Sequence, residues 1–251
     1  MQQDELTSVD RERYRCQMLI EGFGEDAQRK LAGSVIGVVG LGGLGSSACQ
    51  YLAIAGAGRL IIADKEGLEV DDLGRQVLHW ELDVAELRTK VDSAAWKLRR
   101  LNSRVQTTKV PEEINASNVD SFFHDAQVLL DCTNDQDSHS MLNRYCVSRR
   151  IPLVFASVDR FSGVVTTVVP GVSPCLNCIS SELISRDPAP HLIAAAAGVF
   201  GALQAIETVK LSTGYGQPLI GRLLRGDASC NAWTMLDVSR NEMCEVCGSL
   251  R

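Results

Sequence analysis

Four glycines in one short stretch have the spacing of a phosphate-binding loop. Gly40-Leu41-Gly42-Gly43-Leu44-Gly45 follows an uncharged β-branched run and precedes a helical segment. Glycine permits positive φ and close backbone approach, and a helix N-terminus offers free N–H groups to phosphate. Asp64 closes the next buried run, where an acid is suited to ribose hydroxyls. The pattern predicts an adenosine-phosphate site, which NAD, FAD and ATP could all occupy. A structural turn without ligand is the alternative.

Two CxxC pairs form the second chemical pattern, Cys175 with Cys178 and Cys244 with Cys247. Four thiolates complete a tetrahedral zinc site and leave no open position, so the expected site is structural. The pairs are too far apart for a zinc-finger loop and would fasten the C-terminus to the body of the protein. A redox CxxC is the alternative, and it fits less well because neither pair opens a helix after a first strand.

The composition of the 251-residue chain is that of a folded globular protein, with 45% hydrophobic and 22% charged residues. Twenty-five basic and 31 acidic residues give a formal net charge of −6 without a basic run, so no nucleic-acid partner is expected. The longest charge-free apolar stretch, 192–206, is shorter than the roughly 18–20 residues that cross a bilayer. A buried helix and no membrane partner are expected there.

The cysteines and the N-terminus bear on the cellular compartment. Nine cysteines, an odd number, argue against a disulfide framework, and the acidic, polar N-terminus is unlike a signal peptide. We expect a cytoplasmic protein with reduced or metal-bound thiols. Four histidines show no partner spacing and are interpreted as structural: His79, His124, His139 and His191.

Alternation of strands and helices predicts an α/β fold with a doubly wound, mostly parallel, Rossmann-like sheet. A helical lead-in is expected at 8–31, then buried strands at 34–40, 59–64, 127–133 and 152–157. Helices are expected after the glycine loop, at 83–101 and at about 137–149. The long helix at 83–101 has apolar residues spaced by three and four, including Leu87, and Asp83 with Glu86 has capping-box spacing. Strands at 163–170 and around 221–238 would extend the sheet antiparallel.

Several of these segments together resemble the MoeB/ThiF/HesA family, bacterial relatives of ubiquitin-activating enzymes. They are GLGGLGS, LIIAD, the Arg75-Gln76 pair in DDLGRQVLH, LDCT, PCLNC and CEVCG. The resemblance extends from about residue 13 to residue 248. It implies a homodimer with a structural zinc that adenylates, with ATP, the C-terminal glycine of a small β-grasp sulfur carrier ending in Gly-Gly. The chain would be one domain, 1–251, with a nucleotide-binding half at 32–160 and a carrier-binding and zinc half at 161–251.

The resemblance also implies roles for two cations. Arg75 and Lys90 would contact the phosphates of ATP, with magnesium as the metal. A solvated arginine and a snorkelling lysine are the ordinary alternatives. NAD-dependent oxidation, a third function considered, accounts for neither this pair of cations nor the cysteine pairs.

The chain departs from the family pattern at positions that matter for activity. The family arginine that reaches the partner subunit's nucleotide is replaced by Cys16, with an arginine displaced to Arg15, which turns a helical side chain by about 100°. Asp72 replaces an asparagine and adds negative charge near the phosphates. The family's Asp-Asn pair is exchanged to Asn134-Asp135. Because a hard cation prefers carboxylate oxygen, weaker magnesium binding is expected unless Asp135 or Asp72 compensates.

These departures leave two functions open. One is a carrier adenylyltransferase; the other is a catalytically weakened family member that binds a carrier or a paralogue. The loop 179–191 is shorter than in the family and has no cysteine. We therefore expect the enzyme to stop at the acyl-adenylate and to leave sulfur transfer to another protein, a sulfurtransferase. Cys49, Cys132 and Cys146 are expected to be inert core residues, with Cys230 exposed.

Overall fold

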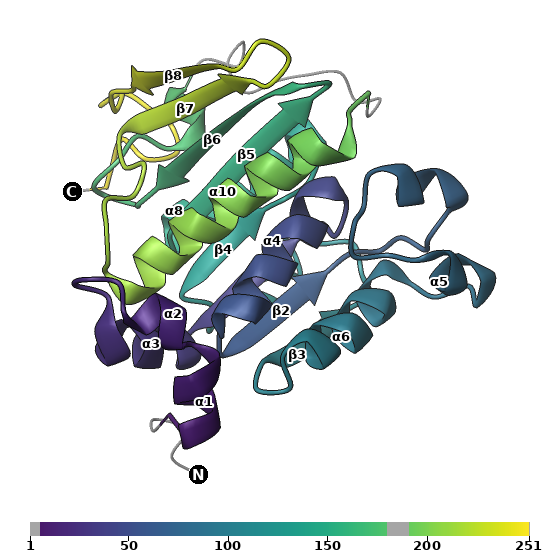
Figure 1. Cartoon of the computed structure of the whole chain (residues 1–251). Helices are drawn as coiled ribbons and strands as arrows, with labels where there is room; N and C mark the ends of the chain where they lie inside the picture. The colour runs from purple at the N-terminus through teal and green to yellow at the C-terminus, as the bar shows by residue number, and fades with distance from the viewer. Residues whose placement is uncertain (1–5, 180–190, 251) are drawn as a thin grey trace.

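A computed structural model of the chain describes residues 6–179 and 191–250, and these residues form an eight-stranded sheet (Figure 1). The strand order is β3-β2-β1-β4-β5-β6-β7-β8, in which β1 to β5 are parallel and β6 to β8 are antiparallel. The strands are β1 (Val35–Val39), β2 (Arg59–Ala63), β3 (Gln106–Val110), β4 (Val128–Asp131), β5 (Leu153–Asp159), β6 (Ser162–Val168), β7 (Arg222–Asp227) and β8 (Ala232–Asp237). The predicted fold class, with its antiparallel C-terminal extension, is confirmed.

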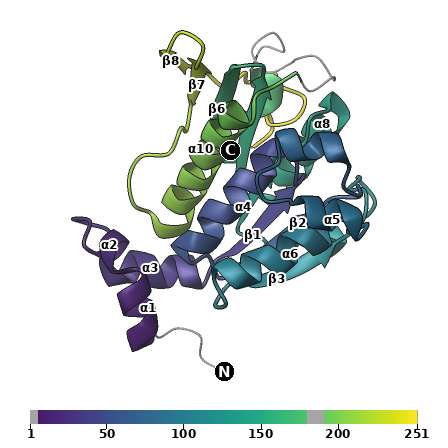
Figure 2. The same ribbon diagram turned by 45° about the vertical axis from the view of Figure 1, so that its right-hand side comes forward.

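Helices cover both faces of the parallel strands (Figures 1 and 2). The helices are α1 (Ser8–Arg13), α2 (Arg15–Met18), α3 (Gly24–Ala32), α4 (Gly43–Ala55), α5 (Glu81–Ala85), α6 (Lys90–Leu101), α7 (Val119–Phe123), α8 (Gln136–Arg149) and α10 (Ala194–Thr213), with 3₁₀ turns η1 (Val70–Gly74) and η2 (Leu176–Cys178). One core lies between the sheet and α4, α6 and α10, and the other between the sheet and α7 and α8. Along β1, Ile36 and Val38 enter the first core while Val39 enters the second, as the pleat requires.

The crossover between β1 and β4 determines where a ligand can bind. Chain connections leave β1 and β4 in opposite directions across the sheet, so a crevice opens at their carboxyl ends. The glycine loop follows β1, Asp64 follows β2, and Asn134 and Asp135 follow β4. The fold therefore brings the predicted nucleotide residues to one edge of the sheet.

Helix α10 is long and apolar enough to cross a membrane by length and composition. In the structure it packs against α4 and the strands β5 and β6. Its buried Glu207 accepts hydrogen bonds from the Thr167 hydroxyl at 2.7 Å and from the backbone N–H of Leu219 at 2.6 Å. These contacts identify α10 as a core helix, which confirms the sequence-based interpretation of 192–206.

The prediction of a single helix at 83–101 is wrong, because the chain forms two helices there, α5 and then α6. Leu87, expected on the apolar face, has φ +53° and is 87% exposed, so the helix breaks at this residue. Asp83 lies inside α5, and Thr89 caps α6 by accepting a hydrogen bond from the backbone N–H of Asp92. Lys90 is consequently the first residue of a helix and not a mid-helix side chain.

Strand β3 was not expected from the sequence. Its residues are mostly exposed and polar, so the segment lacks the uncharged apolar run that marked the other parallel strands. Pairing with β2 specifies it instead, through a register that aligns Ile61 with Thr108. The helical lead-in at 8–31 forms, but as the three short helices α1 to α3.

Candidate active site

The glycine loop is shaped by close contacts that exclude side chains. Gly40 has φ +92°, and a Cβ there would lie 2.6 Å from the carbonyl oxygen of Cys132. A Cβ on Gly43 would lie 2.8 Å from Ala197 of α10, and one on Gly45 would overlap the carbonyl of Gly40. Gly42 is the N-cap of α4 and offers no side-chain cap. The first N–H groups of α4 are thus directed to the cavity that the loop lines, where an anion could accept their hydrogen bonds.

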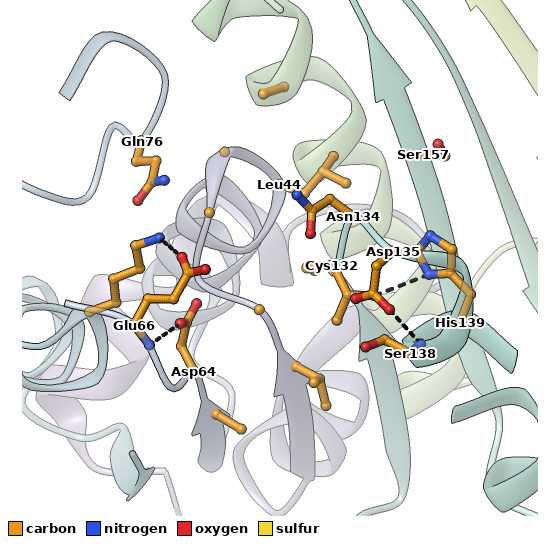
Figure 3. Close-up of a pocket in the computed structure, with 18 of the residues that line it drawn as sticks. Leu44, Asp64, Glu66, Gln76, Cys132, Asn134, Asp135, Ser138, His139 and Ser157 are labelled. Carbon is orange, nitrogen blue, oxygen red and sulfur yellow. Dashed lines mark hydrogen bonds and ion pairs between the residues drawn. The ribbon is translucent and has the colours of Figure 1, made fainter. Parts of the chain in front are cut away.

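Asp64 lines this cavity beside the glycine loop, on the side away from Asn134 and Asp135 (Figure 3). Its carboxylate accepts hydrogen bonds from the backbone N–H of Leu41 at 2.8 Å and of Glu66 at 2.9 Å. Burial raises the pKa of Asp64 above its usual value, although these two hydrogen bonds and Lys90 oppose the shift. Each carboxylate oxygen keeps a lone pair, so Asp64 can also accept a hydrogen bond from a ligand hydroxyl.

Two cations reach the cavity from different elements. Arg75 follows η1, and Lys90 begins α6. Lys90 Nζ lies 2.5 Å from Glu66 Oε2, and Arg75 Nη2 lies 2.9 Å from Asp72 Oδ1. Burial alone lowers the pKa of Lys90, but Glu66, Asp64 and Asp72 raise it above its usual value, so the ammonium stays charged.

Asp72 lies behind the two cations and is not among the residues that line the cavity. It is buried, and its carboxylate contacts Arg75, the Nε2 of Gln76 at 2.6 Å, and Lys90 at 3.7 Å. Asp72 was expected among the nucleotide-binding residues; in the structure its carboxylate contacts Arg75 and Lys90 and does not line the cavity itself. Gln76 lines the cavity, and its buried Oε1 has no partner in the part of the chain that the structure describes.

The end of β4 forms the opposite wall. Asn134 and Asp135 both line the cavity, and Asp135 also accepts a hydrogen bond from the backbone N–H of Ser138 at 2.8 Å (Figure 3). Next to them His139 Nδ1 lies 2.8 Å from Asp131 Oδ2 and 3.1 Å from the Thr133 hydroxyl. Burial lowers the pKa of His139, but Asp131 outweighs it and raises that pKa above the usual value.

Sequence reasoning missed several residues of this cavity, among them Glu66, Gln76 and His139. The pairing of Asp131 with His139 had a local signal, since an acid ends a strand and a histidine lies in the first turn of the next helix. Glu66 had none, because its contact with Lys90 depends on how the segment after β2 packs against α6.

Arg15 lies away from the cavity of its own chain. It is exposed in α2, where the neighbouring Gln17 donates a hydrogen bond to the carbonyl of Ala55 at the C-terminal end of α4. The glycine loop is at the N-terminal end of the 13-residue helix α4. At 1.5 Å per residue, the two ends of α4 are about 20 Å apart. The contact to be recovered is with the partner subunit's nucleotide, so whether Arg15 replaces the family arginine is not tested by its position in one chain.

The four cysteines come together as predicted. The Sγ atoms of Cys175, Cys178, Cys244 and Cys247 all lie within 4.8 Å of one another. Cys175 and Cys244 are 3.7 Å apart, and Cys178 and Cys247 are 3.4 Å apart. Sulfurs that bind one tetrahedral zinc at about 2.3 Å are roughly 3.8 Å apart, so the cluster fits the metal. It joins η2 to the C-terminal segment, at a distance from the nucleotide cavity.

The fold and these two sites define a class of protein: an α/β nucleotide-binding enzyme with a glycine loop at the β1–α4 turn and a four-cysteine cluster. Comparison with known proteins identifies the family. The chain matches the ThiF family over residues 14–246 and belongs to it, which confirms the resemblance seen in the sequence.

Relatives in this family cover nearly the whole chain. Heterocyst protein HesA of Trichormus variabilis is 38% identical over 245 residues, which are 97% of this chain and 91% of HesA. Molybdopterin-synthase adenylyltransferase of Escherichia coli is 34% identical over 249 residues, 97% of this chain and 99% of that protein. This chain is an adenylyltransferase of the ThiF family.

Solved structures support the fold. Escherichia coli MccB, in a complex with MccA-N7isoASN, superposes with a TM-score of 0.85 at 23% identity, covering 98% of this chain and 76% of that one. PaaA superposes with a TM-score of 0.81 at 21% identity, covering 94% and 76%. At these identities the likeness concerns the architecture alone.

Proposed function

We propose that this protein uses Mg²⁺ and ATP to adenylate the C-terminal glycine carboxylate of a small β-grasp sulfur carrier ending in Gly-Gly, in the cytoplasm. The observation that carries the proposal is the convergence of Arg75 and Lys90, from two separate elements, on the cavity of the glycine loop and Asp64. A dinucleotide oxidoreductase has no need of two cations, one of them buried, beside the phosphate-binding turn. A nucleotide triphosphate does, because its charge must be neutralised.

The proposed reaction is a displacement at the α-phosphorus. A carboxylate oxygen of the carrier forms a bond to that phosphorus, the bond to the β-phosphate oxygen breaks, and pyrophosphate leaves with the electron pair. No proton is transferred. The protein must therefore align the two anions and shield their charge. The glycine loop and Asp64 would hold the nucleoside end, and Arg75 and Lys90 the phosphates.

Magnesium would bind at the end of β4. Asn134 offers a neutral carbonyl oxygen, and Asp135 offers the carboxylate oxygen that its helix cap leaves free. Oxygen donors of this kind suit a hard cation such as magnesium. The metal would supply charge neutralisation of the triphosphate.

A homodimer is part of the proposal, because the family's arginine at the position of Cys16 reaches the partner subunit's nucleotide, and the displaced Arg15 would have to make that contact in this chain. Zinc in the four-cysteine cluster would have a structural role. The cysteine-free loop 179–191 lies almost wholly outside the described residues, so the expectation that the enzyme stops at the acyl-adenylate rests on sequence. A separate sulfurtransferase would then act on the adenylated carrier.

The test is ATP–pyrophosphate exchange with purified β-grasp proteins from the same genome. Exchange should depend on one carrier that ends in Gly-Gly, and the matched control is the same carrier without its last glycine. Carrier binding without exchange would contradict the enzyme and support the second candidate, a weakened partner protein. That candidate is favoured by one observation, the neutral Asn134 at the family's acidic position.

A further inference from the structure

His79 lies buried between helix α6 and the glycine loop, outside the nucleotide cavity. Its Nε2 is 3.2 Å from the carbonyl oxygen of Leu41, and its Nδ1 is 2.7 Å from the Ser93 hydroxyl. A carbonyl oxygen can only accept, so the ring proton is on Nε2. Nδ1 then accepts the hydrogen bond that Ser93 donates.

The chain of hydrogen bonds continues behind Ser93. Lys97 Nζ donates to the Ser93 hydroxyl at 2.8 Å and also contacts the carboxylate of Asp83. Both charged residues are buried, and the ring of Trp80 covers the ammonium at 4.4 Å. In this chain Lys97 donates to Ser93, Ser93 donates to His79, and His79 donates to the carbonyl of Leu41.

His79 is a neutral donor in this chain. Burial lowers its pKa to about 4, with the cations Lys97 and Lys90 acting in the same direction and Asp83 against it. The number of donors at Nε2 therefore does not change near neutral pH.

The peptide groups on both sides of Leu41 are held by different elements. Its N–H donates to Asp64 after β2, and its carbonyl accepts from His79 and from the Ser46 hydroxyl of α4 at 3.0 Å. Leu41 stands between Gly40 and Gly42, so its orientation determines where the following N–H groups point. Glycine residues on both sides give the backbone no stiffness of its own.

We infer that His79 is a positioning residue for nucleotide binding, which fixes the glycine loop through the carbonyl of Leu41. The inference rests on the proposed function for its ligand, ATP. The contact of His79 also connects α6 with the glycine loop. Helix α6 carries Lys90, which lines the cavity, and one turn later Ser93, which contacts His79.

A purely packing role does not account for this arrangement. Burying the Lys97–Asp83 pair has a desolvation cost that well-packed apolar residues would avoid. Because Lys97 donates to the Ser93 oxygen, the hydroxyl proton of Ser93 is left for an acceptor. Nδ1 of His79 lies 2.7 Å away, with the Asp83 carboxylate as the second acceptor beside it. Geometry of this kind specifies one loop conformation.

The test compares His79→Gln, His79→Asn and His79→Leu. Glutamine places an amide N–H near the position of Nε2, whereas asparagine reaches only that of Nδ1. ATP binding by calorimetry, without carrier, should weaken about three- to tenfold in the Leu and Asn variants, as expected for one lost hydrogen bond, and return to within about twofold in Gln. His124→Leu, on the exposed end of α7, is the matched control.

Amide hydrogen exchange of residues 41–45 in the nucleotide-free protein gives a second readout. Exchange should be faster in His79→Leu than in the wild type and normal in His79→Gln. Unchanged exchange and unchanged ATP affinity in a folded His79→Leu variant would overturn the inference. A wild type that binds no ATP would overturn the proposed function instead, while the exchange rates would still decide the role of His79. Ser93→Ala serves the same comparison if His79→Leu does not fold.

Discussion

The carboxylate of Asp135 caps helix α8 by accepting a hydrogen bond from the backbone N–H of Ser138 at 2.8 Å. This contact explains how the exchanged pair Asn134-Asp135 fits the fold. The acid occupies the N-cap, where carboxylates satisfy free N–H groups and favour the helix dipole. Against the effect of burial, the Ser138 hydrogen bonds and His139 hold the pKa of Asp135 below its usual value. Asp135 therefore has a structural task in addition to any role in metal binding.

Asp135→Ala should lower stability by about 0.5–2 kcal/mol, the usual cost of losing an N-cap, and should also weaken magnesium-dependent exchange. Asp135→Asn separates the two effects, because asparagine is an equally good cap but a poorer magnesium ligand. Urea unfolding and the magnesium dependence of pyrophosphate exchange are the measurements. If a stable Asp135→Asn variant shows the same magnesium dependence of pyrophosphate exchange as the wild type, Asp135 is excluded as a ligand.

The double exchange Asn134→Asp with Asp135→Asn restores the family order and keeps a good cap. We expect tighter magnesium binding, measured as a lower half-saturating concentration in the exchange assay. If the natural chain is inert with its carrier and the double variant is active, the protein is a weakened family member. If the natural chain and the double variant are both active with the same magnesium dependence, this position does not limit metal binding.

Glu66 and the nucleotide phosphates should compete for Lys90. The 2.5 Å contact between Glu66 and Lys90 lies on the cavity wall, and the Glu66 side chain is largely exposed. Glu66→Gln should therefore tighten ATP binding several-fold, whereas Lys90→Met should weaken it by roughly tenfold or more, as expected for a lost charged hydrogen bond. Calorimetric titration of ATP measures both.

Lys109→Met is the control for these charge changes, because Lys109, on the exposed strand β3, forms a contact of 2.6 Å with Asp92 of α6 away from the cavity. It should bind ATP like the wild type. Weaker binding in Glu66→Gln would mean that Glu66 contacts the ligand or its metal directly.

Residues at strand ends could be predicted from the sequence, because parallel strands bring their carboxyl ends to one edge. Gly40 and Asp64 were predicted from their places after two buried strands and Asn134 from the family resemblance, and all three line one cavity in the structure. The cysteine cluster was predictable for a different reason: four thiols have few other uses in such spacing.

Contacts made by packing between segments could not be predicted. The apolar period continues through Leu87, so nothing in the pattern signals the positive φ that separates α5 from α6. His79 meets Leu41 and Ser93 only in the folded chain, because these partners are 38 and 14 residues away in the sequence. A histidine without a neighbouring partner in sequence was interpreted as structural, and its polar contacts depend on tertiary structure.

The pair His139–Asp131 should make stability depend on pH. The folded-state pKa of His139 is raised, so its contribution is complete below its unfolded pKa of about 6.5 and is lost as pH rises through the folded value. The stability difference between wild type and His139→Gln should thus be largest near pH 6 and shrink towards about pH 9. Urea unfolding of both proteins across this range is the measurement. A constant difference would show that His139 stays neutral throughout. His124→Gln, at the exposed end of α7, provides a histidine control.

Zinc in the four-cysteine cluster should stabilise the C-terminal segment without contributing to nucleotide binding. The cluster fastens Cys244 and Cys247 to η2, and Arg240 adds hydrogen bonds to the carbonyls of Cys247 and Leu250. Because metal-binding free energy is folding free energy at such sites, Cys175→Ser should lose the zinc and melt at a lower temperature while ATP affinity stays within about twofold. Elemental analysis should give one zinc per wild-type chain, and Cys230→Ser, an exposed cysteine outside the cluster, should keep it. Freshly purified wild-type protein without zinc would refute the site, and a Cys175→Ser variant that retains zinc would show that the metal is bound elsewhere.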